Sequence, residues 1–118
     1  MSPSFKIKSI STDELAEIMK KNKNVKIVDV RRPGEYLSEH VENAENAPLD
    51  FINESMLKVD KNSTSYVHCA GGYRSMIFAS ILKARGYDNL IDIKDGFTAI
   101  KESGKIKVTD YVCPTTLV

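Results

Sequence analysis

Short runs of aliphatic and β-branched residues alternate along this chain with segments of helical pattern. The runs at 25–30, 65–68 and 90–93 have the composition of buried strands. Residues 5–10 alternate apolar and polar side chains, which is typical of an exposed edge strand, and residues 47–49 are brief and extended. This order predicts an α/β fold: a mostly parallel sheet of about five strands with helices on both faces.

Helical signals fill the intervals between these strands. Ser11 is followed three residues later by Glu14, a capping box that begins a helix. Pro33 suits the first turn of a second, short helix. The segment 74–85 is the strongest helix and is apolar on nearly every side, so we expect it to be largely buried. A last short helix is expected over 95–104.

The chain length fits one domain. At 118 residues, folding buries about two thirds of the surface that the unfolded chain exposes. We therefore expect a single domain over 1–118, with a core at about 11–104 and a C-terminal tail at 105–118. The sequence carries no signal for the oligomeric state.

Charge and hydropathy exclude several classes of partner. Seventeen Lys and Arg against 16 Asp and Glu give a net charge of +1, so we expect no binding to nucleic acid or to an anionic membrane. No apolar stretch approaches the ~20 residues that span a bilayer, and the N-terminus has no secretory signal pattern. Two cysteines cannot form a disulfide framework, which favours a cytoplasmic location.

Cys69 stands where a predicted strand meets a predicted helix, across a turn that contains Gly71 and Gly72. Glycines allow a tight turn whose N–H groups point inward, and the helix start adds further free N–H groups. A thiol in that position favours the thiolate form, and the same N–H groups can hold an anion or the outer sulfur of a persulfide. The alternative is that Cys69 is a small buried hydrophobic residue.

Four ordered motifs resemble the single-domain rhodaneses. The loop at 69–75, Cys-Ala-Gly-Gly-Tyr-Arg-Ser, is similar to their Cys-x-x-Gly-x-Arg loop. The others are Asp-Val-Arg with Glu-Tyr at 29–36, His-Val-Glu-Asn-Ala-Glu-Asn-Ala-Pro at 40–48, and Gly-Tyr and Asp-Gly-Phe at 86–87 and 95–97. The resemblance covers about 11–104. Asn43 and Asp95 replace glycines of the family pattern, which affects local turns and leaves the loop intact.

The resemblance implies a rhodanese-like fold and a sulfurtransferase without metal or organic cofactor. Cys69 is the expected nucleophile: it takes a sulfane sulfur from thiosulfate or from a small-molecule or protein persulfide and passes it to cyanide, sulfite or a thiol. The expected cradle for the persulfide charge consists of the N–H groups of Ala70, Gly71, Gly72, Tyr73, Arg74 and Ser75.

Charged residues around the loop have two interpretations each. Arg74 either holds an anionic donor or pairs with Asp29 or Glu35 and supports the loop. Asp29, at a strand end, is expected to orient the loop as a hydrogen-bond acceptor. Arg31 either lines the entrance or forms a solvated salt bridge. Together, Asp29, Arg31 and Glu35 are the predicted loop-supporting residues.

The remaining candidates have weaker roles. Tyr73 either shapes access to the loop or is a surface aromatic residue. His68 precedes Cys69 on a strand, so its side chain points to the opposite face and is expected to be packed or hydrogen-bonded rather than a base. His40 is expected to brace a turn, and the two histidines and two cysteines make no metal site. Cys113 stays unassigned.

Two alternatives to a free-standing sulfurtransferase remain open. One is a non-catalytic or accessory module of a larger sulfide-oxidising assembly, because the loop is also similar to rhodanese domains attached to metallo-β-lactamase-fold persulfide dioxygenases. The other is a cysteine phosphatase or an arsenate reductase. Those enzymes carry five residues between Cys and Arg, whereas four residues separate Cys69 from Arg74.

Overall fold

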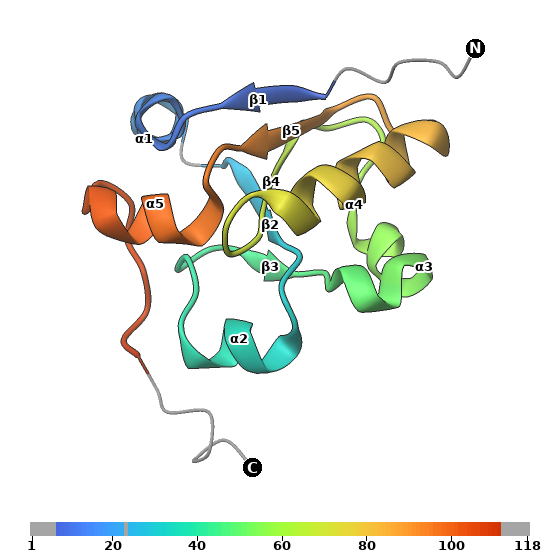
Figure 1. Cartoon of the computed structure of the whole chain (residues 1–118). Coiled ribbons are helices and arrows are strands. Elements are labelled where there is room, and N and C mark those ends of the chain that lie inside the picture. The colour runs from blue at the N-terminus through green and yellow to red at the C-terminus, as the bar shows by residue number, and fades with distance from the viewer. Residues whose placement is uncertain (1–6, 23, 112–118) are drawn as a thin grey trace.

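The computed structural model describes residues 7–22 and 24–111, which form a sheet flanked by helices (Figure 1). In chain order the strands are β1 (Lys8–Ile10), β2 (Lys26–Asp29), β3 (Glu45–Asn46), β4 (Ser65–His68) and β5 (Leu90–Ile93). The α-helices are α1 (Thr12–Lys21), α2 (Pro33–Ser38), α3 (Ile52–Ser55), α4 (Tyr73–Ala84) and α5 (Gly96–Ser103), and short 3₁₀ turns η1 (Leu49–Phe51) and η2 (Met56–Lys58) flank α3.

The five strands pair in the order β1-β5-β4-β2-β3, and every pair is parallel. This confirms the α/β fold with a parallel sheet. In a parallel sheet the carboxyl ends of all strands lie at one edge, where ligands of open α/β folds bind. The chain leaves β2, β4 and β5 at this edge through Asp29, His68 and Ile93.

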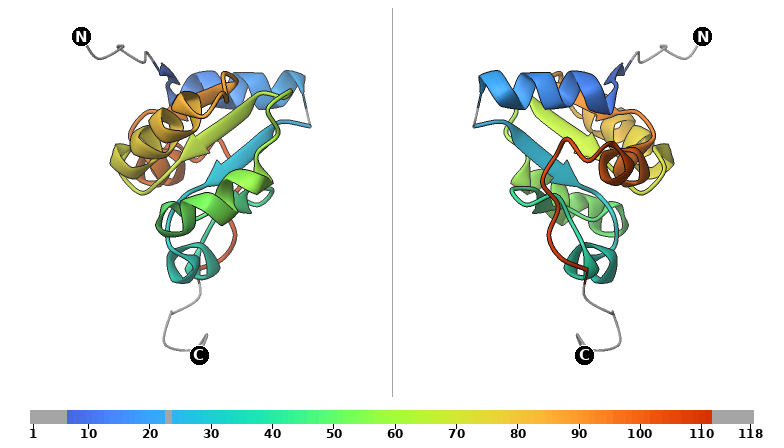
Figure 2. Two further views of the ribbon diagram at one scale, coloured as in Figure 1. Left: turned by 90° about the vertical axis from the view of Figure 1, so that its right-hand side faces the viewer. Right: turned by 90° about the vertical axis from the view of Figure 1, so that its left-hand side faces the viewer.

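Apolar side chains form one core on each face of the sheet. On one face, Val28 and Val67 pack with α4 residues such as Phe78 and Leu82. On the other, Ile27 and Ile93 pack with residues of α1 and α5. The two views of Figure 2 show helices on both faces of the sheet. Because alternate residues of a strand point to opposite faces, each buried strand contributes to both cores.

Several local signals act as the sequence predicts. The side chain of Ser11 accepts a hydrogen bond from the Glu14 N–H at 3.2 Å and caps α1. Pro33 occupies the first turn of α2. Gly86 ends the helical region after α4 with φ of 94°, a conformation that glycine adopts without steric cost.

Three expectations need correction. The third strand is Glu45–Asn46 rather than 47–49, because Leu49 already begins a 3₁₀ turn. Helix α4 is not buried all round: Met76 and Ile77 are each 37% exposed, because only one side of α4 faces the sheet. The edge strand covers Lys8–Ile10, and residues 5 and 6 of its predicted span lie outside the described residues.

The C-terminal tail adds a contact that its sequence does not signal. Val108 forms an antiparallel bridge with Val41, and the Thr109 N–H donates to the His40 carbonyl oxygen at 2.8 Å. Ile106 is buried in the core with α1 and α5. Over the described residues, no helix combines the length and hydropathy required to cross a bilayer.

Candidate active site

Cys69 directly follows β4 and is 1% exposed at the start of the loop that leads to α4. Its Sγ accepts a hydrogen bond from the Gly72 N–H at 3.0 Å and lies 3.6 Å from the Ser75 hydroxyl oxygen. Backbone N–H groups at the start of a helix are the donors that bind anions in proteins, so this turn can hold an anionic group next to Sγ. Cys69 thus lies between the end of β4 and the start of α4, as the sequence predicts.

Two glycines hold the loop in shape. Gly72, the N-cap residue of α4, has φ of 100°, and a side chain there would meet the backbone of Asp95 at 3.3 Å. Gly96 has φ of 55°, and an added Cβ would lie 2.4 Å from the Cys69 carbonyl oxygen. Among the described residues, Asp95 is the only non-glycine residue with positive φ (61°), and it replaces a glycine of the family pattern. Asn43, which replaces another such glycine, does not have positive φ.

The first turn of α5 binds the backbone of the Cys69 loop. The Phe97 N–H donates to the Cys69 carbonyl oxygen at 2.7 Å, and the Thr98 N–H donates to the Ala70 carbonyl oxygen at 3.1 Å. The Thr98 hydroxyl also binds the Ala70 carbonyl oxygen. Free N–H groups of a helix start are good donors, so α5 fixes the carbonyl groups on one side of the loop. On the other side, the Gly72 N–H of the loop itself donates to Sγ.

Ser75 connects Cys69 to a buried carboxyl group that the sequence analysis did not single out. The Ser75 hydroxyl donates to Asp92 Oδ1 at 2.5 Å, and Ser9 donates to Asp92 Oδ2 at 3.3 Å. Ser75 and Asp92 are 0% and 3% exposed. Burial raises the pKa of Asp92, while the hydrogen bonds from Ser75 and Ser9 act in the opposite direction. The sequence signal for this carboxyl group is an acidic residue, Asp92, inside the otherwise apolar run of β5.

Arg74 forms a bidentate ion pair with Glu35, with N–O distances of 2.7 and 3.0 Å. The hydrogen bond from Arg74 holds the pKa of Glu35 below its usual value, against the raising effect of partial burial. Of the two interpretations of Arg74, the structure displays the pairing with Glu35. This pair ties the start of α4 to α2, and about a third of each side chain remains exposed.

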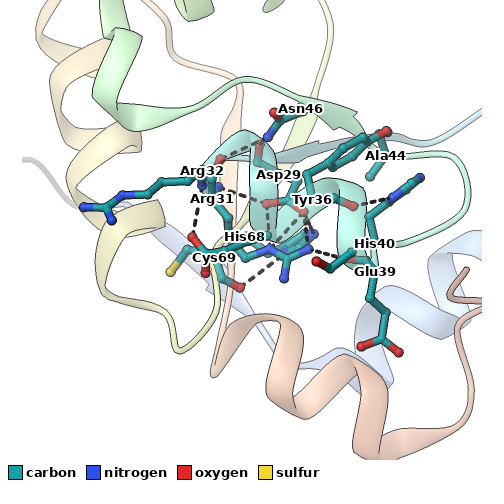
Figure 3. Close-up of polar contacts among 12 residues, drawn as sticks. Asp29, Arg31, Arg32, Tyr36, Glu39, His40, Ala44, Asn46, His68 and Cys69 are labelled. Atoms are coloured by element: carbon teal, nitrogen blue, oxygen red, sulfur yellow. Dashed lines mark hydrogen bonds and ion pairs between the residues drawn. The ribbon is translucent and has the colours of Figure 1, made fainter. Parts of the chain in front are cut away.

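Asp29 and Arg31 form a second, buried pair on the other face of the sheet (Figure 3). Arg31 Nε and Nη2 donate to the Asp29 carboxylate at 2.8–3.0 Å, and the Arg31 backbone N–H donates to it at 2.9 Å. The guanidinium lies 4.2 Å from the centre of the Phe97 ring. Arg31 is 5% exposed, so a solvated salt bridge is wrong: Phe97 and the Glu39 carbonyl group cover the guanidinium.

His68 is fully buried on the same face as Asp29, opposite to the Cys69 side chain. Its Nδ1 lies 3.1 Å from the Cys69 carbonyl oxygen (Figure 3), and because a carbonyl only accepts, Nδ1 carries the proton. Nε2 has no hydrogen-bond partner in the described residues and lies 3.9 Å from Asp29 Oδ2. Burial lowers the pKa of His68, which keeps the ring neutral. His68 therefore supports the loop from beneath.

The other predicted residues lie around the site. His40 stacks on Tyr36, with ring centroids 3.8 Å apart, and its Nδ1 bonds the Tyr36 carbonyl oxygen at 2.7 Å, so it braces the end of α2. Tyr73 is 80% exposed at the first position of α4. Cys113 lies outside the described residues.

A cavity of about 400 Å³ lies beside Arg31 and Glu35, two of the residues predicted to support the loop. It is lined by Arg31, by residues of α2 and α5 such as Glu35, Phe97 and Lys101, and by Tyr111. Residues of the Cys69 loop are not part of its lining. Within the described residues, no three His, Cys, Asp or Glu side chains cluster in a way that could hold a metal ion.

Comparison with known proteins identifies the family of this arrangement. The family model described as "Rhodanese-like domain" matches residues 11–103. A rhodanese-like domain protein from Staphylococcus aureus has a similar structure, with a TM-score of 0.77 and 35% sequence identity; the match covers 88% of this chain and all of that one.

Curated relatives are longer than this chain. An uncharacterised protein of Synechocystis sp. is 30% identical over 91 residues, which cover 77% of this chain and 51% of that protein. The tRNA sulfurtransferase of Thermoplasma acidophilum is 37% identical over 93 residues, which cover 75% of this chain and 18% of that enzyme. The chain thus spans about half of one relative and less than a fifth of the other.

Proposed function

This chain belongs to the family of rhodanese-like domains, and on that premise we propose that it is a sulfurtransferase that carries sulfane sulfur as a persulfide of Cys69. The donor is thiosulfate or a small-molecule or protein persulfide, and the acceptor is cyanide, sulfite or a thiol. Relatives named as sulfurtransferases are consistent with this class of activity.

The position of Cys69 Sγ is the observation that carries the proposal. Cys69 Sγ accepts a hydrogen bond from the Gly72 N–H at the N-terminus of α4, and Cys69 is the only cysteine among the described residues. A persulfide terminus is a diffuse anion, which backbone N–H groups at a helix start stabilise without a cationic surface. The low exposure of Cys69 favours a donor that presents one narrow terminal atom, as a sulfane sulfur does.

The transfer takes place in two steps. The Cys69 thiolate attacks the outer sulfur of the donor, the bond between that sulfur and the rest of the donor breaks, and its electron pair leaves with sulfite or a thiolate. The persulfide anion occupies the cradle of loop N–H groups from Ala70 to Ser75. A nucleophilic acceptor then attacks the outer sulfur, and the electron pair of the S–S bond returns to Cys69.

Loop length supports this assignment over a phosphatase or an arsenate reductase. Four residues separate Cys69 from Arg74, and the Arg74 guanidinium makes two hydrogen bonds to Glu35. A tetrahedral oxyanion needs a wider ring of donors and an arginine that turns toward it. A nucleophilic cysteine must stay reduced to act, so the proposed function also implies a reducing compartment, and we propose the cytoplasm.

Mass spectrometry of the intact protein after incubation with thiosulfate tests the proposal. We expect a gain of about 32 Da, one sulfur atom, that disappears on adding cyanide as thiocyanate forms. The Cys69→Ser variant should show no gain, while the matched Cys113→Ser variant should keep it. No adduct on the wild type with thiosulfate and with a persulfide donor, or an undiminished adduct in Cys69→Ser, contradicts the proposal.

A second arm separates the alternatives. Hydrolysis of a small aryl phosphate that Cys69→Ser abolishes would establish a phosphatase instead. If the folded protein neither gains sulfur nor hydrolyses the phosphate, the accessory-module alternative replaces the enzyme.

A further inference from the structure

The Cys69 thiol has no obvious acceptor for its proton among the ordinary bases of the site. His68 is on the opposite face of the sheet, and its Nδ1 binds the Cys69 carbonyl oxygen rather than Sγ. Asp29 is bound by Arg31 on that same opposite face. Glu35 is bound by Arg74. The proton must nevertheless leave before Sγ can act as a nucleophile.

A hydroxyl group bridges Sγ to a buried carboxyl group on the Cys69 face of the sheet. Ser75 Oγ lies 3.6 Å from Sγ and 2.5 Å from Asp92 Oδ1. A serine hydroxyl donates one proton and accepts others, so it can take a proton from the thiol while passing its own to the carboxylate. Both residues are fixed: Ser75 is in the first turn of α4, and Asp92 is inside β5.

The surroundings of Asp92 make it suited to hold a proton. An acidic residue is uncommon inside a strand, and a buried carboxylate normally has a cationic partner. Helix α4 presents Ser75 to Asp92, β1 presents Ser9, and β4 places Val67 beside it in register. None of the ion pairs within the described residues includes Asp92. Its ionised form is thus stabilised by two hydroxyl groups alone, and burial raises its pKa.

We propose that Asp92, acting through Ser75, takes the Cys69 proton during sulfur transfer and holds it while Sγ carries the sulfur. As the thiolate forms, the S–H proton moves to Ser75 Oγ, and the Ser75 proton moves to Asp92 Oδ1. When the acceptor removes the sulfur, the same two protons move back. Ser75 contacts the reacting atom, whereas Asp92 is a positioning residue that acts through Ser75.

The relay keeps the charge of the buried site constant. Before transfer the site holds a neutral thiol and a carboxylate, and after it a persulfide anion and a neutral carboxylic acid. A second negative charge near a 1% exposed sulfur would be poorly solvated, so a carboxyl group that becomes neutral removes that cost. This inference rests on the proposed function for its role, although the proton transfer itself can be measured without a sulfur donor.

Alkylation of Cys69 by iodoacetamide across pH tests the relay, because only the thiolate reacts. At pH 6 we expect Asp92→Asn and Ser75→Ala to react at least about tenfold more slowly than the wild type. At pH 9.5, hydroxide removes the proton directly, and the three rates should agree within about twofold. The matched variant Ser55→Ala, which removes a buried hydroxyl bonded to the Pro48 carbonyl, should follow the wild type throughout.

The outcomes separate this inference from the proposed function. Equal or faster alkylation of both folded variants at pH 6 overturns the relay, even if the wild type forms a persulfide. A tenfold loss at pH 6 in both variants supports the relay even if no sulfur donor reacts. A loss confined to Asp92→Asn, with Ser75→Ala unchanged, also overturns it, because the proton would then bypass the hydroxyl.

Discussion

Replacing Gly96 with alanine tests whether the close packing of α5 against the Cys69 loop sets the geometry of the site. An added Cβ would lie 2.4 Å from the Cys69 carbonyl oxygen and 2.8 Å from that of Ala70. Both contacts are with backbone, which cannot rotate away as a side chain can. Either α5 or the loop must therefore move.

The size of the effect follows from two contributions. Alanine in the left-handed conformation of Gly96, with φ of 55°, costs about 1–2 kcal/mol. Retreat of α5 weakens the hydrogen bonds from Phe97 N–H to Cys69 O and from Thr98 N–H to Ala70 O, each of which contributes about 1 kcal/mol. We expect Gly96→Ala to lower the free energy of unfolding by about 3–4 kcal/mol and to reduce sulfur transfer.

Two other glycines provide matched controls. Gly104 also has positive φ (65°), but an added Cβ would meet nothing within 4 Å, so Gly104→Ala isolates the conformational cost. Gly34, in the first turn of α2, has neither positive φ nor a close neighbour, and Gly34→Ala should stabilise the protein by about 0.5–1 kcal/mol. Urea unfolding measures stability, and thiocyanate formation measures transfer.

The reasoning is refuted if Gly96→Ala and Gly104→Ala lose the same stability and both keep wild-type transfer. That result would mean that the loop tolerates the displacement of α5 and that the contact between them does not position Cys69.

Two further predictions concern the face opposite Cys69. Arg31→Met leaves the Asp29 carboxylate buried without its cation and should destabilise the protein by about 3–5 kcal/mol, whereas adding Asp29→Asn removes the charge and should recover part of that loss in urea unfolding; a double variant no more stable than Arg31→Met would contradict this account. Burial lowers the pKa of His68, so the unfolded chain takes up a proton below pH 6.5 that the folded chain does not. Stability should therefore fall by roughly 1 kcal/mol for each pH unit below that value. His68→Asn should flatten this slope between pH 7 and 5, and an unchanged slope would show that His68 is not its source.

The order of strands and helices could be predicted from the sequence because its signals are local. The Ser11 cap, Pro33 at the start of α2 and Gly86 after α4 each act within a few residues, and the structure places all three as expected. Where local signals compete, the prediction fails. Residues 47–49 look extended in the sequence, yet Leu49 begins a 3₁₀ turn, and β3 forms two residues earlier, where it pairs with β2.

The contacts around Cys69 depend on the order of the strands in the sheet, which the sequence does not show. Asp92 meets Ser75 because β5 lies beside β4, and Gly96 meets Cys69 because the end of β5 delivers α5 to the same edge. One expectation for Arg31 was a solvated salt bridge, yet Phe97, 66 positions later in the sequence, covers its guanidinium. No pattern within either segment carries that information.

Neighbouring residues alone specify that a cysteine starts a glycine-containing turn between a buried strand and a helix, because strand composition, turn residues and helix signals are local properties. The groups around the sulfur follow from the packing of distant segments: α5 binds the loop backbone, Glu35 pairs with Arg74, and Asp92 binds Ser75. The physical reason is that these contacts join residues 17 to 39 positions apart, whose approach is set by the pairing of parallel strands and the packing of two separate cores.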